Sequence, residues 1–162
     1  MELKEAIMKR FSIRQYRPTP VPENIIRNII ELAKLAPSAG NLQSYKVFIT
    51  KEKIAYDAPI SFVICADPEK SAARYGDKGR NLYAIQDATI FASYLQLAIV
   101  DAGLSSAWVG AFREGKIRSL LKIPDNLKPI VIITVGYPAI EKSDRRRRSF
   151  EEIVHQEQMN SS

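Results

Sequence analysis

The chain has 162 residues, of which 46% are hydrophobic, and this composition predicts one globular domain with a substantial core, which excludes a disordered chain. The formal net charge of +6 indicates an anionic partner, but it leaves a polynucleotide, a lipid surface and a phosphate-bearing cofactor open. A single cysteine, Cys65, excludes a disulfide framework, and no apolar run approaches the ~18 residues of a membrane span. We therefore expect one cytoplasmic domain, residues 1–162, with no membrane partner.

The first half of the chain predicts two helices and two strands. Apolar residues at helical spacing predict a short helix that ends near Arg10, and prolines between residues 18 and 22 then forbid regular structure. A second helix is expected over 22–37, with one apolar stripe, followed by a small polar loop. The runs 45–49 and 59–66 have the length and the β-branched or aromatic content of buried strands.

The second half predicts two more helices and two more strands. Residues 80–103 are apolar on nearly all faces of a helix that Gly103 ends, so this helix must be buried on every side. In so small a chain, a second subunit that covers one side favours a homodimer. Residues 105–112 and 128–138 predict strands, with a helix over 113–123 between them. A mixed order with few strands indicates the α+β class.

Few side chains of the usual catalytic types are present. His155 is the only histidine and lies near the C-terminus, which weakens a serine or cysteine triad and any zinc site with several His or Cys ligands. No glycine-rich phosphate loop of the GxxxxGK or GxGxxG type occurs. We expect Cys65 to be a core residue, no metal to bind and no side chain to be catalytic. Such a protein either binds other molecules without catalysis or is an enzyme whose chemistry comes from a cofactor.

An anion-binding pattern begins at the end of the first helix. Arg10, Ser12 and Arg14 alternate at a spacing of two, so an extended backbone would point all three side chains to one side. Two guanidinium groups and a hydroxyl could then line an elongated anion. By itself this pattern also fits the basic face of a helix end.

Two later segments could also bind an anion. The loop 37–43 offers backbone amides and the side chains of Asn41 and Gln43. Four consecutive arginines begin at Arg145, and in an extended chain Arg145 and Arg147 would share one side. A run of like charge is also typical of a solvated tail.

Four motifs in order along the chain resemble the nitroreductase family of FMN-dependent oxidoreductases: "RFSIRQY", "LAPSAGNLQSYKVFI", "IQDATIFASYLQLAIVDAGLSSAWVGAF" and "RRRRSFEEIVH". The resemblance runs from about residue 3 to 155. It implies a nitroreductase-like fold, with a small mixed or antiparallel sheet flanked by helices, and a homodimer with FMN at the subunit interface. The implied activity passes hydride from NAD(P)H through flavin N5 to a flat acceptor such as a nitroaromatic, a quinone or a flavin.

The resemblance also implies a role for each matching position. Arg10 and Ser12 would face the phosphate of FMN, and Arg14 would lie near the N1/O2 edge of the flavin ring. The partner subunit would contribute the loop 37–43, and the backbone at Gly110 would pass near N5. The implied cofactor-binding residues are Arg10, Phe11, Ser12, Arg14, Pro37, Ser38, Ala39, Asn41, Gln43, Val109, Gly110, Ala111, Arg145 and Arg147.

The chain departs from the family pattern in three places. Position 11 is Phe where the family often has Arg or another polar residue. The connection between the first two strands, near residues 50–58, is shorter than in many members, so pocket material is lost. The four arginines also leave Arg146 and Arg148 as alternatives to Arg145 and Arg147.

Two other hypotheses stay open. The shortened connection favours a flavin-binding or flavin-processing protein without NAD(P)H turnover. The charge of +6 and the arginine run suggest a nucleic-acid module, but the aromatic residues are scattered through apparent core segments and do not alternate with basic residues. We therefore expect a small aromatic electron acceptor and no nucleic acid as the partner.

Overall fold

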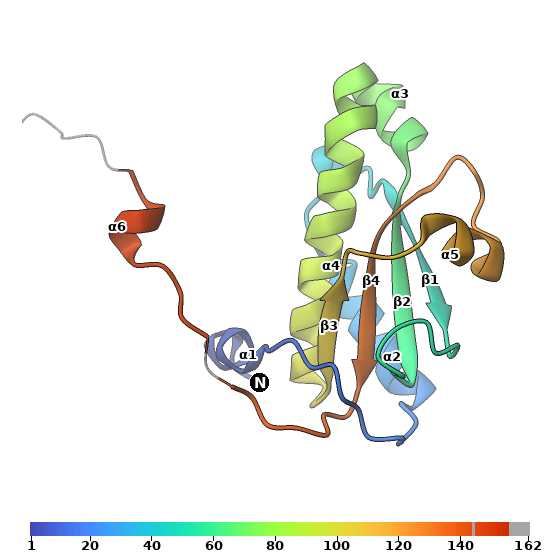
Figure 1. The fold of residues 1–162 in the computed structure, drawn as a ribbon. Coiled ribbons are helices and arrows are strands. Elements are labelled where there is room, and N and C mark those ends of the chain that lie inside the picture. Colours follow the sequence, from blue (N-terminus) through green and yellow to red (C-terminus); the bar gives the residue numbers. More distant parts are fainter. Residues whose placement is uncertain (144, 156–162) are drawn as a thin grey trace, which may run out of the picture.

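A four-stranded antiparallel sheet is the centre of the structure, a computed structural model that describes residues 1–143 and 145–155 (Figure 1). Its strand order is β1-β2-β4-β3, and each neighbouring pair is antiparallel. The strands are β1 (Tyr45–Thr50), β2 (Ile60–Ala66), β3 (Ser105–Val109) and β4 (Lys128–Gly136). The expected α+β class is confirmed, and all four strands lie where the apolar runs predict them.

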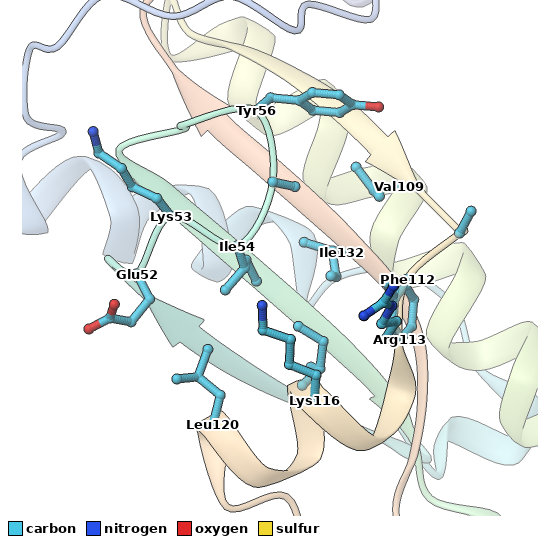
Figure 2. Close-up of a pocket in the computed structure, with 13 residues that line it drawn as sticks. Glu52, Lys53, Ile54, Tyr56, Val109, Phe112, Arg113, Lys116, Leu120 and Ile132 are labelled. Carbon is cyan, nitrogen blue, oxygen red and sulfur yellow. The ribbon is translucent and has the colours of Figure 1, made fainter.

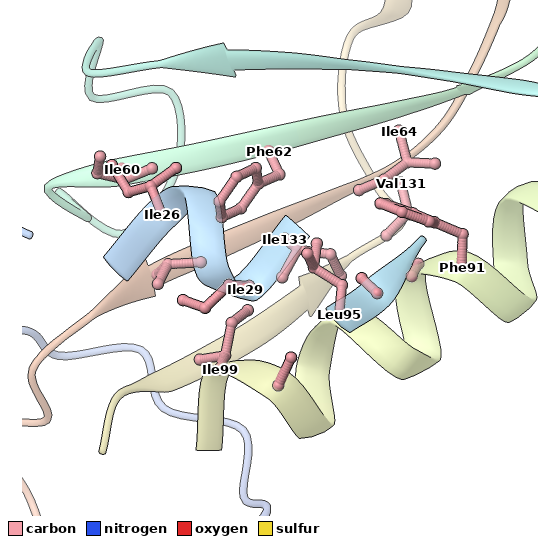
Figure 3. Packing of buried hydrophobic residues seen from close by; sticks show 14 of the residues in the cluster. Ile26, Ile29, Ile60, Phe62, Ile64, Phe91, Leu95, Ile99, Val131 and Ile133 are labelled. Carbon is pink, nitrogen blue, oxygen red and sulfur yellow. The ribbon is translucent and has the colours of Figure 1, made fainter. Parts of the chain in front are cut away.

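The larger core lies between one face of the sheet and two helices, α2 (Glu23–Ala33) and α4 (Ala84–Asp101) (Figure 3). Because strand side chains alternate, every second residue of β2 and β4 points into this core, including Phe62 and Ile133. From the helices, Phe91 and other apolar residues fill the opposite side. This packing fixes α4 along the sheet.

The other face of the sheet carries α5 (Glu114–Leu121) and a smaller apolar cluster. Ile117 of α5 packs there with Cys65 and Ile132. Burial raises the pKa of the Cys65 thiol to about 12, so it stays protonated at neutral pH. The expectation of a core cysteine is confirmed, whereas the cytoplasmic location stays a prediction.

The helix expected over 80–103 has two parts. A π-helical turn, η2 (Gly79–Tyr83), comes before α4, and Gly103 ends α4 with φ of 75°. Backbone hydrogen bonds from Gly103 N to Val100 O and from Leu104 N to Ile99 O complete the predicted glycine cap. One chain, however, does not bury α4 on every side, because Tyr94 is 43% exposed.

Two helices of the structure were not among the elements that the sequence analysis predicted. The sequence analysis missed α3 (Pro68–Lys78), which has few apolar residues and a kink at Gly76. Its start does carry a signal, because the Asp67 carboxylate accepts a hydrogen bond from Lys70 N and proline takes the first helical position. The short α6 (Phe150–Ile153) lies away from the sheet, beyond an extended C-terminal segment (Figure 1).

The N-terminal helix α1 (Leu3–Lys9) lies where it was expected, and a 3-10 turn, η1 (Ala39–Asn41), forms part of the polar loop. Within 1–143 and 145–155, no helix has both the length and the apolar character to cross a membrane.

Candidate cofactor site

The segment after α1 runs extended beside the sheet. Ser12 forms a parallel bridge with Ser106 of β3, and Ile13 N donates to Ser106 O at 3.0 Å. Ile13 is buried, whereas Arg14 is exposed, so successive side chains point to opposite sides. The extended backbone that the spacing of Arg10, Ser12 and Arg14 requires is therefore present.

Tyr16 anchors this segment to the sheet. Its hydroxyl donates to Ile13 O at 2.7 Å and lies 2.7 Å from Thr134 Oγ1, and burial raises its pKa to about 12. Gly136 allows the close approach, because a Cβ there would lie 2.8 Å from Pro59 and 2.9 Å from the Tyr16 ring. These contacts tie the segment that carries Arg14 to the sheet.

A basic cavity of about 460 Å³ lies between the end of α1 and the C-terminal segment. We call it the arginine pocket; its lining includes Arg10, Phe11, Ser12, Arg145 and Arg147, and neither Arg146 nor Arg148. Two segments far apart in the sequence thus contribute three guanidinium groups and a hydroxyl to one cavity. None of the three arginines pairs with a carboxylate among the residues that the structure describes.

Phe11 has a specific contact in this pocket. The guanidinium carbon of Arg145 lies 6.0 Å from the centroid of the Phe11 ring, within the range of a cation–π interaction. The apolar residue at position 11 is therefore in contact with one of the pocket's cations.

Arg14 does not line the arginine pocket. Its Nε donates to the Tyr56 hydroxyl at 3.2 Å, and its guanidinium carbon lies 5.6 Å from the Tyr56 ring centroid. Tyr56 belongs to the short connection between β1 and β2, in a turn closed by a bond from Ala58 N to Ala55 O. The short connection thus contributes a side chain that contacts Arg14, and the sequence analysis did not predict this contact.

A second cavity of about 560 Å³ lies between the β1–β2 connection and α5, and we call it the α5 groove (Figure 2). Val109 and Ala111, both expected near the flavin, line it, and Gly110 lies between them in the chain. Tyr56 forms part of the rim next to Arg14. The groove therefore adjoins the place where the resemblance puts the flavin ring.

The loop 37–43 is held against the start of α4. The buried Asp87 carboxylate accepts from Ala39 N at 2.9 Å and from Ser44 N at 3.3 Å. Asn41 and Gln43 both have positive φ, at 55° and 51°, a conformation that asparagine adopts readily but that costs energy for Gln43. Strained residues of this kind cluster at functional sites.

The loop and the arginine pocket lie at opposite ends of α4. Asp87, in the first turn of the helix, holds the loop, whereas Ser12 pairs with Ser106, which follows the last turn. The 18 residues of α4 span about 27 Å at 1.5 Å per residue. One chain therefore does not bring Pro37, Ser38, Ala39, Asn41 and Gln43 to the arginine pocket.

Comparison with known proteins identifies the family of the chain. The model of the nitroreductase family matches residues 7–57 and 50–137, two segments that meet at the short β1–β2 connection. An "NADH dehydrogenase" from Thermus thermophilus is 28% identical over 95% of both chains. The structure of a nitroreductase family protein from Clostridium difficile is 32% identical, with a TM-score of 0.85 over 97% of this chain and 99% of that one.

A structure from another Clostridium difficile strain, named as an FMN-dependent nitroreductase, is 28% identical, with a TM-score of 0.78 over 93% of this chain and 96% of that one. These matches confirm the nitroreductase-like fold that the motifs predict. The chain belongs to the nitroreductase family.

Proposed function

We propose that this oxidoreductase binds FMN at a site shared by two copies of the chain and passes electrons from NAD(P)H to a flat aromatic acceptor. The observation that carries the proposal is the arginine pocket, where Arg10, Ser12, Arg145 and Arg147 line one cavity. The names of two relatives, an NADH dehydrogenase and an FMN-dependent nitroreductase, support the choice of donor and cofactor.

The pocket fits a phosphate monoester. Guanidinium groups match the geometry of phosphate oxygens, and a charge-assisted hydrogen bond of this kind is worth about 1.5 to 3 kcal/mol. Arg10 and Arg147 supply positive charge, Ser12 supplies a hydroxyl donor, and Arg145 is oriented by Phe11. A few such contacts suffice to hold FMN without a covalent bond.

Arg14 would act at the ring end of the cofactor. The bound flavin supplies the hydride transfer that no side chain of this protein could perform. The Arg14 Nε donates a hydrogen bond to the Tyr56 hydroxyl at 3.2 Å. The guanidinium held in this way would stabilise negative charge at the N1/O2 edge of the flavin ring. The backbone at Gly110 would pass the ring beside Val109 and Ala111, and no nucleophile is required.

The homodimer would complete the site. The loop 37–43 would reach the flavin from the partner, because it lies at the far end of α4 in its own chain. A partly exposed stripe of α4, which includes Ile90 and Tyr94, would provide a surface for the second copy.

The visible spectrum of the protein, purified and reloaded with FMN, tests this function. We expect a flavin spectrum that NADH or NADPH bleaches under anaerobic conditions. A yellow protein that neither nucleotide bleaches would favour a flavin-binding or flavin-processing role. A colourless protein that takes up no FMN, and whose DNA affinity falls steeply with salt, would favour the nucleic-acid hypothesis.

A further inference from the structure

The α5 groove is large enough to hold a ring-sized molecule. Its volume of about 560 Å³ suits a small aromatic ligand. Ile54, Val109 and Ile132 line it with apolar surface, and Phe112 flanks them (Figure 2). A ring bound there would lie beside Val109, close to the proposed position of the flavin.

Basic side chains dominate the charge of the groove. Lys53, Arg113 and Lys116 line it, against a single acid, Glu52. The Lys116 side chain extends from α5 toward the β1–β2 connection, whereas Glu52 lies at the outer end of the groove (Figure 2). The polar end of a bound ligand would therefore meet positive charge.

These cations have no evident role in holding the fold. Arg118, on the same helix, is fully engaged: its Nε lies 2.8 Å from Glu114 Oε1, and its Nη2 donates to Leu127 O at 2.6 Å. By contrast, Arg113 and Lys116 form no ion pair with any acid in the described part of the chain. Glu114, the acid between them, is paired with Arg118 and is thus not available to neutralise them.

We infer that the α5 groove selects electron acceptors that carry an acidic group, such as an aromatic carboxylate. The ring lies over the apolar floor, and the carboxylate is directed toward Lys116 and Arg113. This inference rests on the proposed function, because it takes the groove as the place where the acceptor binds. Positive charge lining a cleft also concentrates anionic substrates and raises their rate of association.

A matched pair of nitro compounds provides the first test with FMN-loaded protein. In the two-electron step, the nitro compound, NAD(P)H and a proton give the nitroso compound, NAD(P)⁺ and water. We expect a lower KM for 4-nitrobenzoate than for its neutral analogue 4-nitrobenzamide at low salt, and a smaller difference at high salt. Lys116→Gln should raise the KM for 4-nitrobenzoate about threefold to tenfold and leave that for 4-nitrobenzamide unchanged.

Lys70→Gln on α3 is the matched control, because it removes the same charge from an exposed position outside the groove. We expect it to change neither KM. Equal KM values for the two acceptors in the unmodified protein would overturn the inference. So would a Lys116→Gln defect that is the same for both acceptors, or one that appears in the KM for NAD(P)H, since the cations would then serve the nucleotide.

Calorimetric binding of 4-nitrobenzoate and 4-nitrobenzamide without NAD(P)H gives a readout that does not depend on turnover. Tighter binding of the carboxylate, lost in Lys116→Gln and kept in Lys70→Gln, supports the inference. Equal binding of both compounds overturns it. Failure of NAD(P)H to reduce the bound flavin would instead count against the proposed function, and the binding comparison would still decide whether the groove selects anions.

Discussion

Within the run of four arginines, alternate residues have different surroundings. Arg145 and Arg147 line the arginine pocket, whereas Arg146 and Arg148 do not. We predict that replacing Arg145 and Arg147 with alanine weakens FMN binding by roughly two to four orders of magnitude, because two charge-assisted contacts of about 1.5 to 3 kcal/mol each are lost. Replacing Arg146 and Arg148 should cost only a long-range attraction that high salt abolishes.

Dissociation constants for FMN, measured for both double variants at low and high salt, check this prediction. Equal losses in the two variants would mean that the run acts as diffuse charge. A larger loss for Arg146 and Arg148 would mean that the opposite register holds the phosphate.

For individual residues, the local sequence pattern predicted some contacts of the site and missed others. Alternation along an extended chain is a local rule, so it was enough to group Arg145 with Arg147 and Ser12 with Arg10. The contact between Arg14 and Tyr56 depends on a turn in which Tyr56 and Asp57 have positive φ, at 53° and 49°. Such turns usually carry Asn, Asp or Gly, so Asp57 fits the turn but Tyr56 does not, and the sequence "AYDA" was too weak a signal to predict it.

Among the elements, the attachment of the loop 37–43 to α4 depends on one carboxylate. Asp87 accepts hydrogen bonds from Ala39 N and Ser44 N and is only 2% exposed. We predict that Asp87→Ala lowers the free energy of unfolding by about 2 to 4 kcal/mol, because two backbone donors lose their partner. Urea unfolding measures the loss, with Asp125→Ala on an exposed turn as the control. A loss no greater than that of the control would show that the loop is held by other contacts.

Helix α4 also presents a stripe that its own chain covers only in part. Gln86, Ile90, Ser93 and Leu97 follow one another at spacings of three or four, and Tyr94 beside them is 43% exposed. We predict that Ile90→Lys converts the proposed dimer to a folded monomer, because a charge at the proposed subunit interface would lose its hydration.

Sedimentation velocity at micromolar concentration measures the conversion, and Leu35→Lys, at a position that is 72% exposed, is the control. A flavin-loaded monomer in the unmodified protein would contradict this interface.

The elements also differ in how well their sequences predicted them. Strands β2 and β4 are continuous apolar runs because both of their faces are buried. In contrast, α3 is mostly polar and has few large apolar residues, so no apolar run marked it, although the Asp67 cap could have. The α5 groove depends on contacts between the β1–β2 connection and a helix about sixty residues later, which no local pattern predicts.

For the whole molecule, the distance along α4 has one main consequence. The arginine pocket and the loop 37–43 lie at opposite ends of the helix, so a site that uses both must combine two chains. In a twofold dimer, each of two identical sites would then take its phosphate pocket from one copy and its loop from the other.

A hybrid dimer tests this central claim most directly. One chain carries Arg145→Ala and Arg147→Ala, and the other carries Asn41→Gly and Gln43→Gly, which remove the amide side chains and leave the positive φ accessible. Each variant alone should bind FMN poorly. The hybrid, refolded from both chains and isolated through two different affinity tags, should bind one FMN per dimer with unmodified affinity, because one site is intact and the other has both defects. A hybrid that binds FMN no better than its two parents would contradict a site shared between chains.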